Sequence, residues 1–410
     1  MKKMKGNLII GQSGGPTAVI NASVAGIISG ALKQGFDGEI LGMVNGIEGL
    51  LKENFIDLKE RFSDPLKREA LINTPSAYLG SCRFKMPAPE ADLSLYEKVY
   101  EIIKKHDIRY FLYIGGNDSM DTVYRLSEYF KGKDYEISIV GVPKSIDNDL
   151  AGTDHCPGYG SAAKFIASSI REMAIDTSVY DLKSVLIVEI MGRNAGWLTA
   201  SSVLARTEGI TAPDLIYLPE TEFNPERFLS DIGEKLKEKN TVIAAVSEGI
   251  KGADGKYICD SLSSGAIDNF GHKYLSGAGK VLENMVRERL GVKARAVELN
   301  VLQRCAGHLK SGCDVSETLK NGEDAFSAAL SGVTGMMMGY VRVSDTPYSV
   351  KSVPEDIKNA ANAEKVIPKE WITPEGNDVT DEFIKYAAPL IEGEYHPEFS
   401  GGLPVYITRG

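Results

Sequence analysis

The chain has 410 residues and a formal net charge of −10 at pH 7, and 43% of its residues are hydrophobic. This length predicts two or three domains, and the hydrophobic share is sufficient to build their cores. The acidic balance argues against a nucleic-acid or anionic-membrane partner, because both require a net basic surface. Any anionic ligand must therefore be held by a few local arginines and lysines.

The cysteines and the apolar runs indicate the setting of the protein. The five cysteines are odd in number and scattered, with no CxxC pair, which favours a reduced cytoplasm and no disulfide framework. The apolar run near the N-terminus, 8–10, is shorter than the core of a signal peptide. No later run approaches the length of a membrane span. We therefore expect a soluble, cytoplasmic protein.

Short apolar runs alternate with amphipathic stretches along the chain. The intervening segments 15–35 and 93–108 carry apolar residues at every third or fourth position, which is typical of helices. This alternation predicts an α/β fold with mainly parallel sheets and with ligands at the carboxyl ends of the strands. The expected strands are 7–11, 39–44, 110–116, 137–143, 184–192, 214–219 and 241–249.

The first glycine-rich turn lies in "GQSGGPTAVINASVAGII" (11–28), which predicts a strand, a turn and a helix starting near Pro16. Backbone N–H groups at such a turn, together with the positive end of the helix, bind phosphate. The turn is neither a Walker loop nor GxGxxG, so a turn without a ligand is equally compatible. A later loop carries Arg83 and Lys85; arginine matches phosphate oxygens well, although surface charge is the simpler interpretation.

A second glycine turn raises a question about its ligand. In "LYIGGNDSMDT" (112–122), Gly115 and Gly116 end a buried strand and let the backbone approach an anion closely. Asp118 follows directly and repels anions. Either the turn holds no phosphate, or the carboxylate excludes one phosphate while admitting another.

The segment "VGVPKSIDNDLAGTDHCPGYGSAA" (140–163) is the most informative. Lys144, Ser145, Asp147 and Asp149 are packed just past the carboxyl end of a predicted strand. Such a cluster suits proton abstraction from a hydroxyl, with one carboxylate as the base, the other holding a metal or orienting the base, and Lys144 countering phosphate charge.

Further charged residues follow later strands. Met191, Gly192 and Arg193 end the run 184–192, and Glu248 ends the run 241–249 in a position to accept hydrogen bonds from sugar hydroxyls. Arg295 and Arg304 form a plausible pair for the phosphate of a phosphosugar. Together with the two carboxylates and the lysine, this set indicates phosphoryl transfer to a sugar hydroxyl.

These segments, in this order, resemble the phosphofructokinase family over about residues 7–340. The motifs that carry the resemblance are SGGPTAVINA, GSCRF, GGNDS, PKSIDND, MGR, a strand-end SEG and the late arginine pair. The resemblance implies two Rossmann-like domains with the active site in the cleft between them. It divides the chain into a phosphoryl-donor domain (1–160 plus about 305–345), a sugar-phosphate domain (161–304) and a peripheral C-terminal extension (346–410).

Within this family, members that use pyrophosphate carry aspartate at the second position after the glycine pair and lysine before the IDND motif. Asp118 and Lys144 match that pattern. The resemblance implies that Asp118 occupies the space of an ATP α-phosphate, where a second negative charge is costly. The alternatives are an ATP-dependent enzyme that tolerates Asp118 and a non-catalytic phosphosugar sensor; the intact Asp147 and Asp149 argue against the sensor.

The resemblance also implies roles for individual residues, with fructose 6-phosphate and pyrophosphate as substrates, Mg²⁺ as cofactor and a homodimer or homotetramer as the assembly. Asn117 stands where much of the family has a metal-binding aspartate. Lys183 stands shortly before the MGR strand, where the family usually has an arginine that a neighbouring subunit borrows, so a lysine is expected to substitute for it. The catalytic set is Asp147 as base, Asp149, Lys144, Asp118 and Arg193; pyrophosphate is assigned to Gly15, Arg83, Gly116, Lys144 and Ser145; the sugar phosphate to Ser145, Ile146, Asp147, Met191, Gly192, Arg193, Glu248, Arg295 and Arg304; and Mg²⁺ to Asn117 and Asp149.

Overall fold

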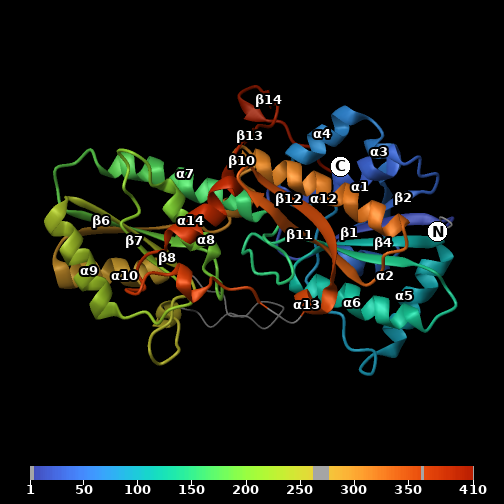
Figure 1. The fold of residues 1–410 in the computed structure, drawn as a ribbon, viewed down its shortest axis with the longest axis horizontal. Helices are drawn as coiled ribbons and strands as arrows, with labels where there is room; N and C mark the ends of the chain where they lie inside the picture. The colour runs from blue at the N-terminus through green and yellow to red at the C-terminus, as the bar shows by residue number, and fades with distance from the viewer. Residues whose placement is uncertain (1–3, 262–276, 362–363, 410) are drawn as a thin grey trace.

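The computed structural model describes residues 4–261, 277–361 and 364–409. Its strands form two larger sheets, of seven and four strands, which lie in opposite halves of the elongated molecule (Figure 1). Helices cover both faces of each sheet, so the predicted α/β fold is confirmed. None of the described helices is both long enough and apolar enough to cross a membrane.

The larger sheet has the strand order β12-β11-β5-β4-β1-β2-β3 and is parallel except at its two edges. Successive side chains of a strand face opposite sides, so Leu8 and Ile10 pack in one core and Ile9 packs in the other. Its strands are β1 (Asn7–Gln12), β2 (Ile40–Met43), β3 (Phe55–Asp57), β4 (Ile108–Gly115), β5 (Ser138–Pro143), β11 (Met336–Asp345) and β12 (Tyr348–Asp356).

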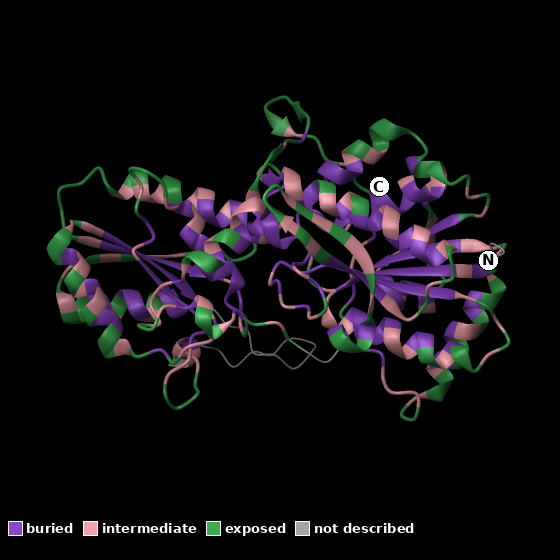
Figure 2. Cartoon of the chain, in the orientation of Figure 1, coloured by how far each residue is buried: buried purple, intermediate pink, exposed green. Residues whose placement is uncertain are grey.

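Helices pack against both faces of this sheet (Figure 2). One face is covered by α1 (Ile20–Lys33), α3 (Leu58–Phe62), α4 (Pro65–Asn73) and α12 (Gly312–Leu330), and the other by α2 (Gly46–Leu51), α5 (Leu93–Lys105), α6 (Asn117–Lys131) and α13 (Ile357–Ala361). Helices α1 and α12 approach each other so closely that a Cβ at Gly26 would lie 2.2 Å from the carbonyl oxygen of Leu319. Glycine is therefore required at that crossing.

The smaller sheet is fully parallel, with the order β7-β8-β6-β9. Its strands are β6 (Ser184–Ile190), β7 (Leu215–Tyr217), β8 (Thr241–Ser247) and β9 (Lys293–Glu298). Helices α9 (Pro225–Glu238) and α10 (Ala278–Leu290) pack on one face, and α7 (Tyr159–Thr177), α8 (Trp197–Ala200) and α14 (Asp381–Ala387) on the other. The remaining elements are α11 (Leu302–Cys305), four 3₁₀ turns, η1 (Ser201–Ala205), η2 (Ile258–Ser261), η3 (Lys369–Trp371) and η4 (Ala388–Ile391), and the short pairs β10 (Lys310–Ser311) with β13 (Glu394–Tyr395) and β14 (Phe399–Ser400) with β15 (Leu403–Pro404).

The predicted strands are all present, but the first helix begins at Ile20 rather than near Pro16. The Thr17 hydroxyl accepts a hydrogen bond from the backbone N–H of Val19 at 3.3 Å, and Gly14 is in the left-handed region with φ of 76°. This local side-chain bond competes with the helical pattern. Residues 13–19 therefore form a loop, and Gly15 lies before the helix rather than at its N-terminus.

The C-terminal segment contributes more than the predicted peripheral extension. Strand β12 pairs antiparallel with β11 along its length, and Trp371, Phe383 and Tyr386 surround Trp197, with Tyr386 and Trp197 ring centroids 5.3 Å apart. These aromatic residues are spaced through an otherwise polar sequence, and they pack against the half of the molecule that contains the smaller sheet. The predicted division of the chain into domains stays a prediction.

We expect Phe383→Ala to lower stability by about 3–5 kcal/mol, the usual cost of truncating a fully buried phenylalanine. Phe383 is 0% exposed, whereas Phe399 is 54% exposed and its alanine variant serves as the matched control. Both tryptophans of the chain lie in this cluster, so the midpoint of urea unfolding followed by tryptophan fluorescence reports it directly. Equal midpoints for the two variants would contradict a core role for this segment.

Candidate active site

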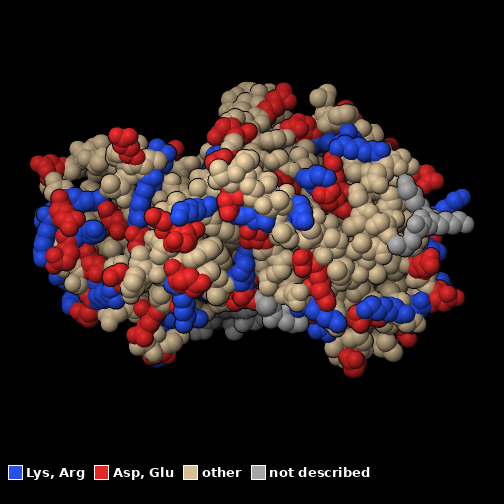
Figure 3. Space-filling view, viewed as in Figure 1, with Lys and Arg blue, Asp and Glu red and all other residues tan. Residues whose placement is uncertain are grey.

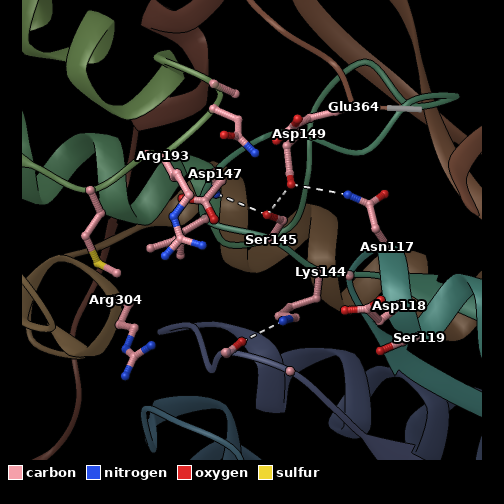
Figure 4. A pocket seen from close by; sticks show the side chains of 18 of the residues that line it. Asn117, Asp118, Ser119, Lys144, Ser145, Asp147, Asp149, Arg193, Arg304 and Glu364 are labelled. Carbon is pink, nitrogen blue, oxygen red and sulfur yellow. Dashed lines mark hydrogen bonds between the residues drawn. The ribbon is translucent and has the colours of Figure 1, made fainter. Parts of the chain in front are cut away.

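A cleft of about 560 Å³ lies where the carboxyl ends of strands from the two larger sheets face each other. It is lined by the turns that follow β1, β4, β5, β6 and β8, as parallel α/β sheets predict. Figure 4 shows Lys144 and Asp118 across from Arg193 and Arg304. The predicted residues that line it are Gly15, Arg83, Gly116, Asn117, Asp118, Lys144, Ser145, Ile146, Asp147, Asp149, Met191, Gly192, Arg193, Glu248 and Arg304.

Lys144 is a buried cation at the end of β5, only 4% exposed. Its Nζ donates a hydrogen bond to the carbonyl oxygen of Gly15 at 2.6 Å, which ties the loop after β5 to the first glycine turn. Burial lowers the pKa of Lys144 to about 8, although the negative charges of Asp149 and Asp147 oppose that shift. The ammonium therefore stays mainly protonated at neutral pH and can bind an anion.

The two carboxylates of the IDND motif have different surroundings (Figure 4). Asp149 accepts hydrogen bonds from Ser145 Oγ at 2.6 Å and from Asn117 Nδ2 at 3.2 Å, so both of its oxygens are held by protein donors. The hydroxyl of Ser145 also accepts from the backbone N–H of Asp147 at 3.1 Å. Burial, with the adjacent charge of Asp149, raises the pKa of Asp147 well above its usual range. Asp147 is thus the carboxylate suited to take up a proton, and Asp149 fixes the loop.

Asn117 offers an acceptor that the protein does not use. Its Nδ2 is bound to Asp149, but its buried Oδ1 has no hydrogen-bond partner. An unpaired oxygen beside a carboxylate fits a hard cation such as Mg²⁺. Among the residues that the structure describes, no three His, Cys, Asp or Glu side chains gather as a metal site. A cation held here would therefore draw its remaining ligands from phosphate and water.

Asp118 lies in the first turn of α6 and lines the cleft, with its side chain 43% exposed. The Nζ of Lys85 approaches its Oδ1 to 3.7 Å. The sequence analysis identified Lys85 in a basic loop but did not foresee this pairing, because the two residues are distant in the chain. The positive charge of Lys85 partly offsets the negative charge of Asp118, so this carboxylate repels an anion less strongly.

The wall opposite Lys144 is built by the turns after β6 and β8. Gly192 has φ of 127°, and a Cβ there would lie 2.6 Å from the carbonyl oxygen of Ala195, so only glycine fits the turn. Its backbone N–H donates to Glu248 Oε1 at 3.2 Å. Burial raises the pKa of Glu248 to about 7. Glu248 can therefore either accept from or donate to a ligand hydroxyl near neutral pH.

The structure separates the two late arginines that the sequence analysis paired. Arg304, on α11, lines the cleft beside Gly15, where a Cβ would lie 3.6 Å from its Nη1. Arg295 lies in the middle of β9, opposite Leu186, and is exposed in a separate shallow depression with Lys280, Arg287 and Lys293. Because ligand-facing residues follow the carboxyl end of a strand, its mid-strand position keeps Arg295 out of this chain's cleft.

Some lining residues were missed by the sequence analysis. Ser13 and Gly14 belong to the turn that it recognised, and Phe84 and Asn194 neighbour predicted arginines. Glu364 comes from the C-terminal segment, and burial raises the pKa of its carboxyl. No local motif marks Glu364, since only the packing of the C-terminal segment brings it to the cleft.

Comparison with known proteins identifies the family of the chain. The family model described as phosphofructokinase matches residues 7–308. The chain is 41% identical over 406 residues to the pyrophosphate–fructose 6-phosphate 1-phosphotransferase of Xanthomonas campestris pv. campestris, covering 98% of this chain and 96% of the relative. The protein of the same name from Methylococcus capsulatus is 40% identical, with 98% and 95% covered. The crystal structure of a pyrophosphate-dependent phosphofructokinase from Nitrosospira multiformis superimposes with a TM-score of 0.89 at 38% identity, covering 98% of this chain and 96% of that one.

Proposed function

This chain belongs to the phosphofructokinase family, and we propose that it transfers a phosphoryl group reversibly from pyrophosphate to the 1-hydroxyl of fructose 6-phosphate. The products are fructose 1,6-bisphosphate and phosphate. The observation that carries the proposal is that Asp118 and Lys144 line one cleft with the carboxylate Asp147. Full-length relatives that bear this activity in their names support it.

The donor lies on the Lys144 side of the cleft in this proposal. The space there is suited to a compact polyanion. It is surrounded by two cations, Lys144 and Arg83, and by the turns at Gly15 and Gly116, where the backbone can approach an anion closely. Asp118 closes the far end of that space. A longer nucleotide donor would bring its α-phosphate against this carboxylate, which is unfavourable in a partly desolvated site.

The acceptor lies on the opposite wall, against Met191, Gly192, Arg193 and Glu248. Glu248, already fixed by the N–H of Gly192, would bind sugar hydroxyls, and Arg193 would bind phosphate. Arg304 would contribute from α11. Val301, 46% exposed just before α11, has only an apolar side chain and would give the sugar phosphate no hydrogen bond from that side chain.

In the forward reaction, the oxygen of the 1-hydroxyl attacks the terminal phosphorus of pyrophosphate and the bridging P–O bond breaks. Asp147 takes the hydroxyl proton, and its raised pKa matches that task near neutral pH. Lys144 offsets the charge that moves onto the leaving phosphate. Asp149, bound to Ser145 and Asn117, holds the loop in register without moving a proton.

Mg²⁺ is the proposed cofactor, held by Asn117 Oδ1 and Asp149 together with phosphate oxygens of the donor. When bound it would supply positive charge to the transferring group.

We expect Asn117→Ala to raise the Mg²⁺ concentration for half-maximal rate by about 10-fold, on the scale typical of weakened metal sites. Glu128→Ala, at an exposed position of the same helix outside the cleft, is the control, and an unchanged Mg²⁺ requirement in Asn117→Ala would exclude the site.

We also propose a homodimer or homotetramer in the cytoplasm. The exposed cationic depression around Arg295, and Lys183 at the start of β6, would then face a neighbouring copy. None of the five cysteines, all of which the structure describes, forms a disulfide, which supports a reducing setting. Sedimentation of the purified chain measures the assembly directly.

As a test of the base, Asp147→Ser should lower kcat by at least about 10²-fold, the scale for removing a general base, with less effect on KM. The exposed Asp134→Ser is the matched control. Steady-state kinetics with pyrophosphate and fructose 6-phosphate provide the measurement. Near-normal turnover in Asp147→Ser would rule out the assigned role.

The donor assignment is tested with pyrophosphate and ATP on the wild type, Asp118→Gly, Lys144→Gly and the double variant. Wild type should prefer pyrophosphate, and Asp118→Gly should open the α-phosphate space and gain measurable ATP use. Lys144→Gly should lose about 2–4 kcal/mol of transition-state stabilisation with pyrophosphate, in kcat as well as KM. The double variant should show the highest ratio of ATP to pyrophosphate use, because both residues face one donor. A wild-type preference for ATP, or an unchanged ratio in Asp118→Gly, would overturn the donor assignment.

A further inference from the structure

A short segment near the C-terminus, residues 364–367 (the strap), begins with an isolated bridge between Glu364 and Leu150 of the catalytic loop and leads to the half of the molecule that contains the smaller sheet. The backbone N–H of Lys365 donates to the carbonyl oxygen of Asp149 at 2.8 Å. On its other side, Trp197 Nε1 donates to the carbonyl oxygen of Lys365 at 2.8 Å, and the N–H of Ile367 donates to Glu220 Oε1 at 3.1 Å. The strap therefore joins the loop that carries Asp149 to the wall that carries Trp197.

The side chain of Lys365 enters the interior of the catalytic loop. Its Nζ donates to Asn148 Oδ1 at 3.3 Å and to the carbonyl oxygens of Thr153 at 3.2 Å and Asp154 at 2.8 Å. The ammonium also lies 5.1 Å from the ring centroid of Trp197. Burial lowers the pKa of Lys365, so enclosing this cation costs stability that the three acceptor oxygens offset. An apolar side chain would fill this position at a lower desolvation cost, but it would hold none of those oxygens.

The residue that Lys365 contacts lies between the two functional carboxylates. Asn148 has φ of 55°, a left-handed conformation that asparagine adopts at some cost. Its side chain is fully buried; Oδ1 also accepts from the N–H of Cys156 at 2.9 Å, and Nδ2 donates to the hydroxyl of Tyr386 at 2.8 Å. Holding Asn148 in this conformation fixes the directions in which Asp147 and Asp149 leave the backbone.

We propose that Lys365 is a positioning residue for phosphoryl transfer, which keeps Asp147 aimed at the acceptor by clamping Asn148 and the carbonyls of the loop. The inference rests on the proposed function for its kinetic consequence, but the clamp itself is independent of it. Lys365 does not line the cleft, and it acts only through the loop. The C-terminal segment is thereby a part of the catalytic machinery and not only of the core.

The first test replaces Lys365 with methionine, which keeps the length of the side chain and removes its donors and charge. We expect Lys365→Met to lower kcat by at least about 10-fold while each KM changes less than about 3-fold, because small displacements of a reacting group reduce rate more than binding. Lys369→Met, an exposed lysine of the same segment, is the control and should leave kcat unchanged. An unchanged kcat in Lys365→Met, or a raised KM with normal kcat, would overturn the proposal.

Chemical rescue separates positioning from a loss of folded protein. Lys365→Ala leaves room for a small amine, and ethylammonium should restore several-fold of the lost kcat, whereas tetramethylammonium, which has no N–H donor, should not. Absence of rescue, with rates that only follow the folded fraction, would leave a purely structural role and refute positioning. If Lys365 variants do not fold, Trp197→Phe removes a single anchor of the strap and should lower kcat in the same direction by a smaller factor.

A measurement without substrate distinguishes failure of the clamp from failure of the proposed function. Hydrogen exchange of the peptide covering 147–156 should be faster in Lys365→Met than in Lys369→Met, since the amide of Cys156 is bonded to Asn148 Oδ1. Equal exchange in the two variants would refute the clamp. Faster exchange in a chain that shows no wild-type activity with pyrophosphate would instead refute the proposed donor and leave the clamp standing.

Discussion

The site depends on the mutual compensation of buried charges in the loop after β5. Lys144 is almost fully enclosed, and its ammonium would lose its proton more readily still without the carboxylates of Asp147 and Asp149 beside it. Asp147 in turn is pushed towards its protonated form by burial and by Asp149, and Lys144 opposes this shift. Neither charge is tolerable alone in this setting, because an unpaired buried ion is costly. Their balance limits the lowering of the pKa of Lys144 and the raising of the pKa of Asp147 that burial causes.

This balance requires a loop whose geometry is set from outside. Asn117 of α6 donates to Asp149, which also accepts from Ser145 within the loop itself. Tyr386 and Lys365 of the C-terminal segment hold Asn148. The two larger sheets contribute opposite walls, and the acidic and basic side chains of the surrounding surface are interspersed (Figure 3). Within the cleft, the lower dielectric strengthens the interactions among the charged side chains.

Local sequence predicted those parts of the site that follow buried strands. Lys144, Gly192 and Glu248 each come directly after a continuous apolar run, and the edge of a parallel sheet collects such residues without further information. Strand β9, "KARAVE", was not foreseen because it alternates charged and small residues and lies half exposed at a sheet edge. Arg295 lies on this strand, exposed and outside this chain's own cleft, so its predicted role in binding the sugar phosphate stays a prediction. The start of α1 depends on a hydrogen bond to the Thr17 hydroxyl, and the place of Glu364 in the cleft depends on long-range packing. Neither leaves a periodic signal in the sequence.

For the role that we propose for Asp118, its position gives a physical reason, beyond simple repulsion, why a nucleotide donor would be excluded. It occupies the first turn of α6, directly after a glycine turn, which is the place where helix N–H groups and the helix dipole normally favour a bound anion. A carboxylate in this turn gains the same stabilisation that a phosphate would gain, so the protein supplies its own anion. Lys85 at 3.7 Å reinforces that occupancy. The stabilisation comes from the helix terminus, so a donor that ends before α6 loses no binding energy. A donor that extends to α6 must compete with a carboxylate that is covalently attached to the chain and cannot diffuse away.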